Sequence, residues 1–565
     1  MQVTYPGKKD FTQKIKDART GSLDLVVVVT AALDAGGADE MKLFLADCVR
    51  ALKDGGLLFV HGHPHLLPEL GTYLDQRLTF KYWIAIETIA QYDKSGLPSV
   101  HAAMLLFVKG SNGFNINRVR IPHPVCDFCG NPLRDWGGKK HLMNPDGFVI
   151  SDVWKYWPSE NNHHRISSSV LNTILELANA TENGLRVSAM SDALIDQQPR
   201  ERMGVIGPKE GLGQGASVSE YPKQYRLPGF DDPLERYGED TAPLSNRMFN
   251  VVHCGDALKI LRRYPDNSID LVFADPPYNL DKRYNVYDDG REDEHYINWC
   301  NTWLKEYVRL LKPTGSLYVL NLPRWAMYHA AFLNQHLHFQ NWIVWDALSE
   351  PRGKLMPAHY ALLFYTKHPS NFTFNYEQVG QIDARAYCLR ASCTRSRKLA
   401  GVDKKEPLTD FWWNIHRIKH KRDRDHHPCQ LPEALMERVI RLSTNPNDTV
   451  LDAFSGAGTT AVVSARLGRR YVAIDMDEKY ARITERKIAE VERNGYVRRR
   501  PIHKPERGYT KKELQLELRS LAVRLGRLPT PDDVRQLSKY RVQAFYEMFP
   551  TWGKALKAAK LEVQE

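Results

Sequence analysis

Residues 450–460 have the sequence Val450-Leu451-Asp452-Ala453-Phe454-Ser455-Gly456-Ala457-Gly458-Thr459-Thr460. This pattern predicts a buried strand that runs into a glycine turn and then into a helix that continues to Leu467. The two glycines let the backbone come close to a ligand, and the free N–H groups of the helix face that ligand. A second strand, residues 471–474, ends in Asp475, which is placed to accept hydrogen bonds from ribose hydroxyls. The alternative is a tight turn followed by a surface aspartate.

Another apolar strand is expected at residues 269–274, directly before Asp275-Pro276-Pro277-Tyr278-Asn279. The two prolines stop the sheet hydrogen bonding and fix the backbone. Asp275 and the carbonyl of Pro276 can both accept hydrogen bonds from one NH2 group, while Tyr278 can stack on a flat ring. A turn that only ended a strand would not need this acid and this ring together.

Short apolar strands alternate with helical stretches along both halves of the chain. In the second half the strands are expected at residues 269–274, 316–321, 449–453 and 470–475. This alternation predicts an α/β fold with a mainly parallel, doubly wound sheet, whose ligands lie at the carboxyl ends of the strands.

The two halves resemble each other. Residues 50–56 align with residues 309–315 at an offset of 259, and the same offset pairs Trp83 with Trp342. At an offset of 258 the match continues through the pairs His101 and His359, Asp152 and Asp410, and Trp154 and Trp412. The chain is therefore interpreted as an internal duplication.

The first copy lacks the residues that carry chemistry in the second. When Asp24-Leu25 is aligned with Asp270-Leu271, Val29-Thr30-Ala31-Ala32 stands where the second copy has Asp275 to Tyr278. No equivalent of the glycine turn follows Leu177. We therefore expect the first copy to be catalytically inactive and to act as a built-in pseudo-subunit.

The motif at 275–278, followed by the glycine turn at 454–458, resembles S-adenosylmethionine-dependent DNA amino-methyltransferases of the permuted β class. In that class the catalytic motif precedes the cofactor motif, and the resemblance covers residues 250 to 490. It implies that Phe454, Gly456 and Gly458 hold the methionine part of S-adenosyl-L-methionine. It also implies that Asp475 binds the ribose and Asp256 the adenine. The further cofactor-binding residues that we expect from the same motifs are Asp452, Thr459 and Gln430.

Gln430 belongs to the segment His427-Pro428-Cys429-Gln430-Leu431-Pro432, which resembles the motif that the family has before the glycine loop. The segment departs from that motif at Leu431, where the family often has lysine. The alternative interpretation is a helix that starts here with Pro432 in its first turn.

The resemblance implies methyl transfer to an exocyclic amine of a DNA base, with Asp275, Pro276, Pro277 and Tyr278 as catalytic residues. The target base must be flipped out of the duplex and stacked on Tyr278. An aspartate at the first motif position resembles the adenine-N6 enzymes, whereas cytosine-N4 enzymes more often have serine there. Adenine is thus favoured and cytosine stays an alternative. A non-catalytic DNA-binding regulator is the alternative from another class, and the intact motifs argue against it.

Composition sets the outer limits. The 565 residues carry a net charge of +11, and 42% of them are hydrophobic, which excludes a disordered protein. The longest apolar run, Leu25 to Val29, is too short to span a bilayer. The N-terminus lacks the pattern of a secretion signal, so a cytoplasmic protein is expected.

Four segments are expected along the chain. Residues 1–195 form the degenerate methyltransferase-like domain, and residues 196–245 form a linker rich in glycine and proline. Residues 246–497 form the catalytic domain, with a target-recognition insert at about 377–426. The insert holds 12 Lys+Arg against 7 Asp+Glu, and the alternative for it is a solvated basic face.

Residues 508–565 are expected to form a helical DNA-binding module. From 498 onward the chain has 16 Lys+Arg against 8 Asp+Glu. Leu514, Leu518, Leu521 and Leu525 share one helical face, Gly526 ends that helix, Thr530 caps a second one, and a third starts at Thr551. The segment resembles the homing-endonuclease-associated repeat, which implies DNA binding. The alternative is a plain three-helix packing unit.

The expected partners are double-stranded DNA and, if the enzyme belongs to a restriction system, a cognate restriction endonuclease; a solitary enzyme would have none. No membrane partner is expected, and the protein is expected to be either a monomer with an internal pseudo-dimer or a homodimer. Cys126 and Cys129 have the spacing of a zinc knuckle, and the second half offers Cys388 and Cys393. A complete site needs four ligands and no second close pair lies nearby in sequence, so we expect free thiols and no metal.

Overall fold

The computed structural model describes residues 3–4, 8–30, 38–91, 96–110, 115–133, 143–156, 161, 165–179, 187–189, 194–195, 245, 247–280, 290–347, 353–388, 390–418, 430–497, 509–549 and 551–561. Residues 1–497 form one compact unit and residues 498–565 form another. The expected linker, apart from Ser245, lies outside the described residues, as do Ala31, Ala32 and residues 427–429. Below, the catalytic half means the described residues of 247–497, and the N-terminal half means those of 1–195.

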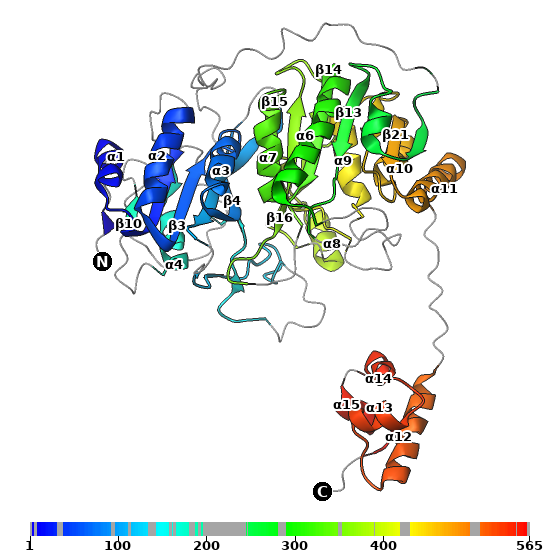
Figure 1. Ribbon diagram of the computed structural model, residues 1–565. Helices are drawn as coiled ribbons and strands as arrows, with labels where there is room; N and C mark the ends of the chain where they lie inside the picture. The colour runs from blue at the N-terminus through cyan, green and yellow to red at the C-terminus, as the bar shows by residue number, and fades with distance from the viewer. Residues whose placement is uncertain are drawn as a thin grey trace. The chain divides into compact units, whose positions relative to one another are not determined.

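The catalytic half is built on an eight-stranded sheet with the order β12-β21-β20-β13-β14-β16-β15-β19 (Figure 1). All neighbouring strands are parallel except at β16, which runs antiparallel to both of its neighbours. The strands are β12 (Val251–Cys254), β13 (Ile269–Ala274), β14 (Leu311–Asn321), β15 (His338–Asp346), β16 (His359–Thr366), β19 (Phe411–Trp412), β20 (Thr449–Asp452) and β21 (Arg470–Asp475). The expected mainly parallel sheet is therefore present.

Helices cover both faces of this sheet because its central strands are buried on both sides. Along β13, Ile269, Val272 and Ala274 pack into the core beneath α6 and α7, whereas Leu271 and Phe273 pack into the core beneath α9. The helices are α5 (Ala257–Leu261), α6 (Asp293–Leu310), α7 (Pro323–Leu333), α9 (Glu433–Ser443), α10 (Thr459–Arg466) and α11 (Glu478–Asn494).

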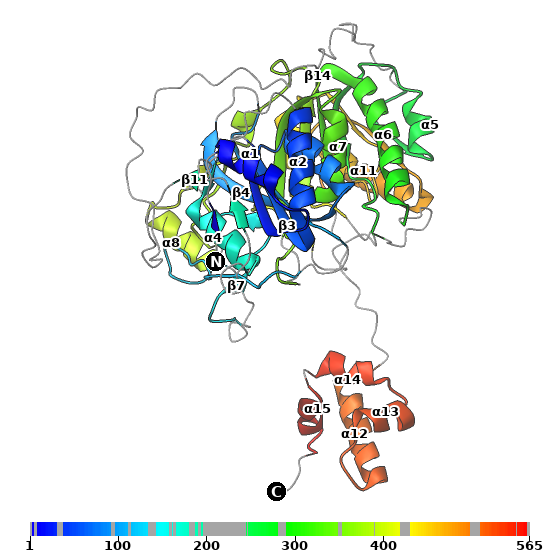
Figure 2. The same ribbon diagram turned by 60° about the vertical axis from the view of Figure 1, so that its left-hand side comes forward.

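The N-terminal half has a seven-stranded sheet with the order β1-β10-β2-β3-β5-β4-β8. Its strands are β1 (Val3–Thr4), β2 (Leu23–Val29), β3 (Leu52–Gly62), β4 (Thr79–Gln91), β5 (Ser99–Val108), β8 (Val153–Trp154) and β10 (Val187–Ala189). Its helices are α1 (Lys8–Asp17), α2 (Ala38–Ala51), α3 (Leu67–Asp75) and α4 (Ser168–Leu177). Figure 2 shows α1 and α2 on the same side of this sheet, where Phe11 contacts Phe44 with ring centroids 5.8 Å apart.

Five strands of the first sheet, β2-β3-β5-β4-β8, have the same order and the same directions as β13-β14-β16-β15-β19. Beyond β2 the two sheets differ. The first sheet continues through β10 to β1, whereas the second continues from β13 through β20 and β21 to β12. Among the described residues, the first sheet thus has two strands on this side where the second has three.

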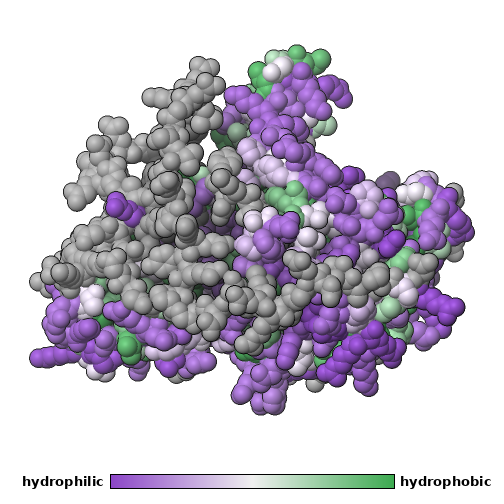
Figure 3. All heavy atoms as spheres, turned by 90° about the horizontal axis from the view of Figure 1, so that it is seen from above, coloured by the Kyte–Doolittle hydropathy of each residue, from purple (hydrophilic) through white to green (hydrophobic). Residues whose placement is uncertain are grey.

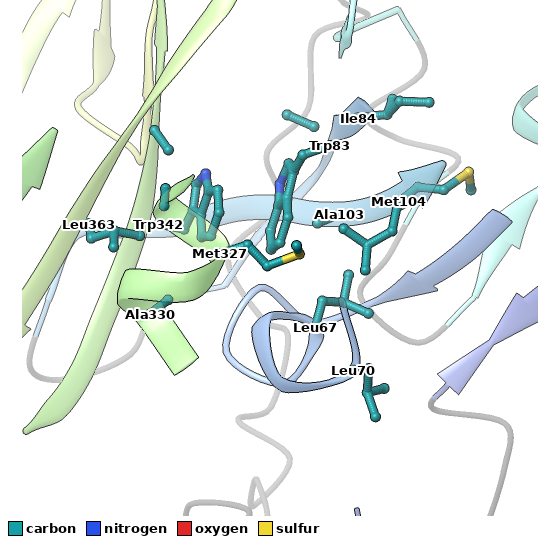
Figure 4. Close-up of a cluster of buried hydrophobic side chains, with 14 of the residues drawn as sticks. Leu67, Leu70, Trp83, Ile84, Ala103, Met104, Met327, Ala330, Trp342 and Leu363 are labelled. Atoms are coloured by element: carbon teal, nitrogen blue, oxygen red, sulfur yellow. The ribbon is translucent and has the colours of Figure 1, made fainter. Parts of the chain in front are cut away.

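The two halves pack against each other through equivalent elements. Helices α3 and α7 lie side by side where the sheets meet (Figure 1). The indole rings of Trp83 and Trp342 stack with centroids 3.7 Å apart and planes 5° from parallel (Figure 4). A Cβ atom on Gly71 of α3 would lie 2.1 Å from the sulfur of Met327 of α7, so the glycine leaves room for the Met327 side chain against α3.

Hydrogen bonds across this interface also come in equivalent pairs. The carboxylate of Asp410 accepts from the backbone N–H of Val100 at 2.8 Å, and that of Asp152 accepts from the N–H of Ala358 at 2.8 Å. Asp410 and Asp152 are buried, and Asp410 accepts as well from the Ser99 hydroxyl at 2.7 Å. An exchange of the same contact in both directions is the property of a two-fold symmetric interface.

Smaller elements complete the first unit. They are β6 (Arg120–Ile121), β7 (Phe148–Val149), β9 (Ile166–Ser167), β11 (Leu194–Ile195), β17 (Gln381–Asp383), β18 (Lys405–Pro407), α8 (Ala391–Leu399) and the 3-10 helix η6 (Tyr376–Gln378). Where Figure 3 colours the described residues, hydrophilic side chains cover most of the visible face. Among the described residues no helix is both long and apolar enough to cross a membrane.

The described residues of the second unit, 509–549 and 551–561, form four helices rather than the three that we expected. They are α12 (Lys511–Leu525), α13 (Pro531–Leu537), α14 (Val542–Met548) and α15 (Trp552–Ala558). The capping predictions are confirmed, because the Thr530 hydroxyl accepts from the N–H of Asp533 and Gly526 ends α12 with φ of +64°. The unpredicted helix, α14, is only seven residues long and is held by the buried side chains of Ala544 and Phe545.

Candidate active site

A cavity of about 220 Å³ opens at the carboxyl ends of β13, β20 and β21. The predicted site residues that line it are Asp256, Asp275, Pro276, Pro277, Tyr278, Gln430, Asp452, Phe454, Gly456, Thr459 and Asp475. They meet because parallel strands present their carboxyl ends at the same edge of the sheet. The segment at 275–278 and the glycine turn, far apart in sequence, therefore form one site.

The glycine turn is held in place by two carboxylates. Asp452, at the end of β20, accepts hydrogen bonds from the N–H of Phe454 at 2.9 Å and from the hydroxyl of Thr460 at 2.6 Å. Asp475, at the end of β21, accepts from the N–H of Gly456 at 2.8 Å. The two strands thus fix the loop from both sides.

Gly458 does not belong to the cavity lining, although we expected it to hold the cofactor. Its φ is +77°, and a Cβ atom there would lie 2.3 Å from the Thr484 hydroxyl of α11. Glycine is therefore needed at 458 for the left-handed start of α10 and for the close packing of α11.

The carboxyl groups of Asp452 and Asp475 have raised pKa values. Burial raises the pKa of Asp475 to about 6, although the N–H groups of Asp477 and Gly456 act in the opposite direction. Burial also raises the pKa of Asp452 to about 6, and the nearby charge of Asp475 contributes in the same direction. Raised pKa values in a cavity are typical of functional sites.

The segment at 275–278 is held by two hydrogen bonds from tyrosine hydroxyls. Tyr278 donates to Oδ1 of Asp275 at 2.6 Å, and Tyr296 of α6 donates to the carbonyl of Pro277 at 2.6 Å. The Tyr278 ring is buried, and its centroid lies 5.8 Å from that of Tyr360 on β16. Tyr278 thus orients the carboxylate in addition to offering the ring that we expected.

One wall of the cavity is aromatic, and it was not predicted from the sequence. Trp299 and Trp303, one turn apart on α6, contact the Phe454 ring with centroids 5.7 and 5.3 Å away. The guanidinium of Arg291 lies 5.1 Å from the centre of the Trp299 ring. Tyr480 of α11 also lines the cavity. The two tryptophans at helical spacing were the available signal, but an aromatic helix face is usually core.

The remaining predicted residues, Asp256, Gln430 and Thr459, also line the cavity. Asp256 caps α5 by accepting from the N–H of Lys259 at 2.9 Å. Gln430 lines the cavity, while the hydroxyl of Thr459 donates to the carbonyl of Leu431 at 3.4 Å. Helix α9 begins at Glu433 with Pro432 as its cap, so the helix start that we weighed for this segment is present.

In the expected recognition insert, the described aromatic residues pack inward. Trp412 and Phe411 are buried in β19, and the Trp413 indole donates to Glu406 at 3.1 Å. The insert also contacts the N-terminal half, because Arg385 forms an ion pair of 2.5 Å with the buried Glu87. The insert is thereby tied to the other half of the molecule.

A doubly wound sheet, with a glycine turn and an aspartate at the carboxyl ends of neighbouring strands, is the arrangement of nucleotide-binding α/β proteins. Comparison with known proteins identifies the family. The model of the family described as DNA methylase matches residues 269–486, and that of the homing endonuclease associated repeat matches residues 509–562.

Three relatives illustrate the likeness. The chain is 36% identical to the Type II methyltransferase M.BamHI of Bacillus amyloliquefaciens over 39% of this chain and 53% of the relative. It is 34% identical to the Type II methyltransferase M.HpaI of Haemophilus parainfluenzae over 43% of this chain and 75% of the relative. It is 29% identical to the DNA adenine methyltransferase YhdJ of Escherichia coli (strain K12), over 45% and 87%. The match spans about half of M.BamHI but three quarters or more of the other two.

The chain belongs to the DNA methylase family, as its motifs suggested, and carries a homing endonuclease associated repeat at its C-terminal end. DNA methylases of this family take the methyl group from S-adenosylmethionine. The cavity suits that molecule, because it combines an aromatic wall, a glycine turn and a carboxylate at the end of β21.

Proposed function

We propose that the protein is a sequence-specific DNA methyltransferase that transfers a methyl group to the exocyclic N6 of adenine. The observation that carries this proposal is that Asp275 to Tyr278 and the glycine turn with Asp475 line one cavity. A cofactor and a flipped base bound there would lie within reach of each other. The name of YhdJ, a DNA adenine methyltransferase, agrees with adenine as the base.

The chemistry assigned to these residues is positional and electrostatic. When bound, S-adenosylmethionine supplies an electrophilic methyl group on a sulfonium. Asp275 and the carbonyl of Pro276 accept hydrogen bonds from the target NH2, which localises the nitrogen lone pair in the direction of that methyl group. The hydrogen bond from Tyr278 keeps the Asp275 carboxylate oriented before the base arrives. We assign adenine recognition to Asp256 and ribose binding to Asp475.

The test is incubation of the protein with labelled S-adenosylmethionine and unmethylated DNA, followed by identification of the modified base and its sequence context. We expect N6-methyladenine at a defined sequence. Detection of N4-methylcytosine would show that cytosine, the alternative base, is the target. Absence of transfer would favour the non-catalytic regulator.

Cofactor affinity should depend on pH because of Asp475. An ionised carboxylate accepts hydrogen bonds from ribose hydroxyls more strongly than the protonated acid does, and burial raises the pKa of Asp475 to about 6. We therefore expect affinity for S-adenosylmethionine to be high above this pKa and to fall as the pH drops through it. Calorimetric titration of the protein with S-adenosylmethionine at values from about pH 5 to about pH 8 measures this change in affinity.

In Asp475→Asn, affinity should be lower at high pH and the remaining pH dependence should shift to lower pH. The shift is expected because the charge of Asp475 contributes to the raised pKa of Asp452. Without that charge, Asp452 should titrate at lower pH. Asp448→Asn is the matched control, because Asp448 also has a raised pKa but does not line the cavity. An unchanged pH profile in Asp475→Asn would argue against the ribose assignment.

We further propose that the N-terminal half is a degenerate copy of the methyltransferase fold and that the two halves form an internal pseudo-dimer. Equivalent lysines in the two halves support the duplication. Lys109 donates to the carbonyl of Leu52, and Lys367 donates to that of Leu311, both at 2.8 Å. The paired contacts of Asp152 and Asp410 support the pseudo-dimer. The inactive copy has Val29 and Thr30 at the end of β2, where β13 is followed by Asp275 and Pro276.

The C-terminal unit is assigned to DNA binding on the basis of its basic charge and its repeat match. Deleting residues 498–565 should weaken DNA affinity and flatten its dependence on salt, because each phosphate that the protein no longer neutralises takes about 0.9 from the slope of log K against log salt. Binding measured at several salt concentrations checks this, with methyl-donor binding as the control. An unchanged slope would favour a packing unit that does not contact DNA.

A further inference from the structure

Four cysteine sulfurs converge at the contact between the two halves. Cys126, Cys129, Cys388 and Cys393 place their Sγ atoms all within 4.8 Å of one another. The sulfurs of Cys126 and Cys393 are 3.7 Å apart, as are those of Cys129 and Cys388. A tetrahedral zinc ion with Zn–S bonds of about 2.3 Å requires sulfurs about 3.8 Å apart. The thiols thus already have the spacing of a four-cysteine zinc site.

The backbone around the first pair has the shape of a metal-binding knuckle. The N–H of Gly130 donates to the carbonyl of Cys126 at 2.8 Å, and Gly130 has a φ of +65°. The side-chain amide of Asn131 donates to the sulfur of Cys129 at 3.4 Å. Metal-bound thiolates commonly accept such hydrogen bonds from neighbouring groups.

The second pair has a cationic donor. Arg397, only 2% exposed, donates to the sulfur of Cys393 at 3.1 Å and to the carbonyl of Cys388 at 3.0 Å. Arg397 also forms an ion pair with Asp403 at 3.0 Å, which balances the charge of the guanidinium. The guanidinium thus supplies a hydrogen bond to the Cys393 sulfur, as the surroundings of metal-bound thiolates commonly do.

This part of the molecule has little other core. The cluster consists of Cys126, Cys388 and Cys393, with only Cys129, Leu133 and Tyr387 packed against it. Helix α8 buries no aliphatic side chain, because its buried residues are Cys393 and Arg397. Segments with so small an apolar core are commonly held together by a structural metal.

We propose that Cys126 and Cys129 of the N-terminal half and Cys388 and Cys393 of the recognition insert bind one structural Zn²⁺ ion. Four protein ligands leave no open coordination position, so the site is structural rather than catalytic. We expected no metal from the sequence because the two pairs are more than 250 positions apart, whereas the fold brings their sulfurs together.

The zinc ion fastens the recognition insert to the N-terminal half. The same contact includes the ion pair of Arg385 with Glu87 and a hydrogen bond of 3.0 Å from the N–H of Asp127 to the carbonyl of Ala386. The N-terminal half therefore sets the position of the insert. The zinc proposal itself does not depend on the methyl-transfer activity.

The test is metal analysis of the purified full-length chain, produced with zinc in the growth medium. We expect one zinc ion per chain, and loss of zinc in Cys129→Ser and in Cys388→Ser. Cys48→Ala is the matched control, because Cys48 is a buried free thiol on α2 outside the cluster and its removal should leave the zinc content unchanged.

A second measurement does not require the variants to fold. In the wild-type chain, replacement of zinc by Co²⁺ should give the absorption spectrum of tetrahedral cobalt thiolate, and bound metal should protect the four cysteines from alkylation. Zinc below one equivalent, iron in its place, or cysteines alkylated equally with and without metal would each overturn the proposal.

Discussion

Alanine in place of Asp275 should reduce methyl transfer by about 100- to 1000-fold, the range found when one preorganised electrostatic interaction at a reacting centre is removed. Asp275 follows β13, and its carboxylate accepts a hydrogen bond from the hydroxyl of Tyr278 at 2.6 Å. Without the carboxylate, the target amine has one acceptor fewer to localise its lone pair. Single-turnover transfer of labelled methyl groups to DNA measures the effect.

Affinity for S-adenosylmethionine should change little in Asp275→Ala, because the glycine turn is held by Asp452 and Asp475. Tyr278→Phe removes only the hydroxyl and should cause a smaller loss of transfer. Asp39→Ala, at a carboxylate that is 96% exposed in the N-terminal half, is the control and should behave as wild type. Transfer by Asp275→Ala at the wild-type rate would refute the assigned chemistry.

Alanine in place of Trp342 should lower the stability of the first unit by about 3–5 kcal/mol, as is typical when a buried tryptophan is truncated. Trp342 is 1% exposed and stacks on Trp83 of the other half at 3.7 Å. The cost includes the cavity that the truncation creates and the absence of a stacked partner. Denaturant unfolding followed by circular dichroism measures the change.

The combination of Trp83→Ala with Trp342→Ala tests whether the halves are coupled. Each variant removes the stacking partner of the other, so the double variant should lose less stability than the sum of the two single losses. Trp342→Phe keeps an aromatic ring at the contact and serves as the conservative control. Strictly additive losses would contradict a shared interface.

Local sequence patterns predicted the secondary structure of the catalytic half well. The expected strands at 269–274 and 470–475 have those bounds in the structure, and the glycine turn leads into a helix at Thr459. These elements follow from apolar periodicity and glycine conformations over a few neighbouring residues. The helix α14 was missed because its seven residues are stabilised mainly by burial of Ala544 and Phe545.

The candidate site was predictable as far as a topological rule applies. Eleven of the residues expected from the motifs line the cavity, because strand ends of a doubly wound sheet meet at one edge. Gly458 is not among the lining residues, and its packing against Thr484 accounts for a glycine at this position. The tryptophan wall on α6 was missed, because a helix face that lines a cavity has the same pattern as one that fills a core.

By itself, the sequence determined the α/β class, the likeness of the two halves, the motifs of the DNA methylase family and the amphipathic helices of the C-terminal unit. Only the tertiary structure decided which residues meet across the two halves: Trp83 with Trp342, Asp410 with Val100, and the two cysteine pairs. Periodicity and turn preferences act over a few residues. Contacts between residues hundreds of positions apart depend on how two folded sheets pack, which no local pattern specifies.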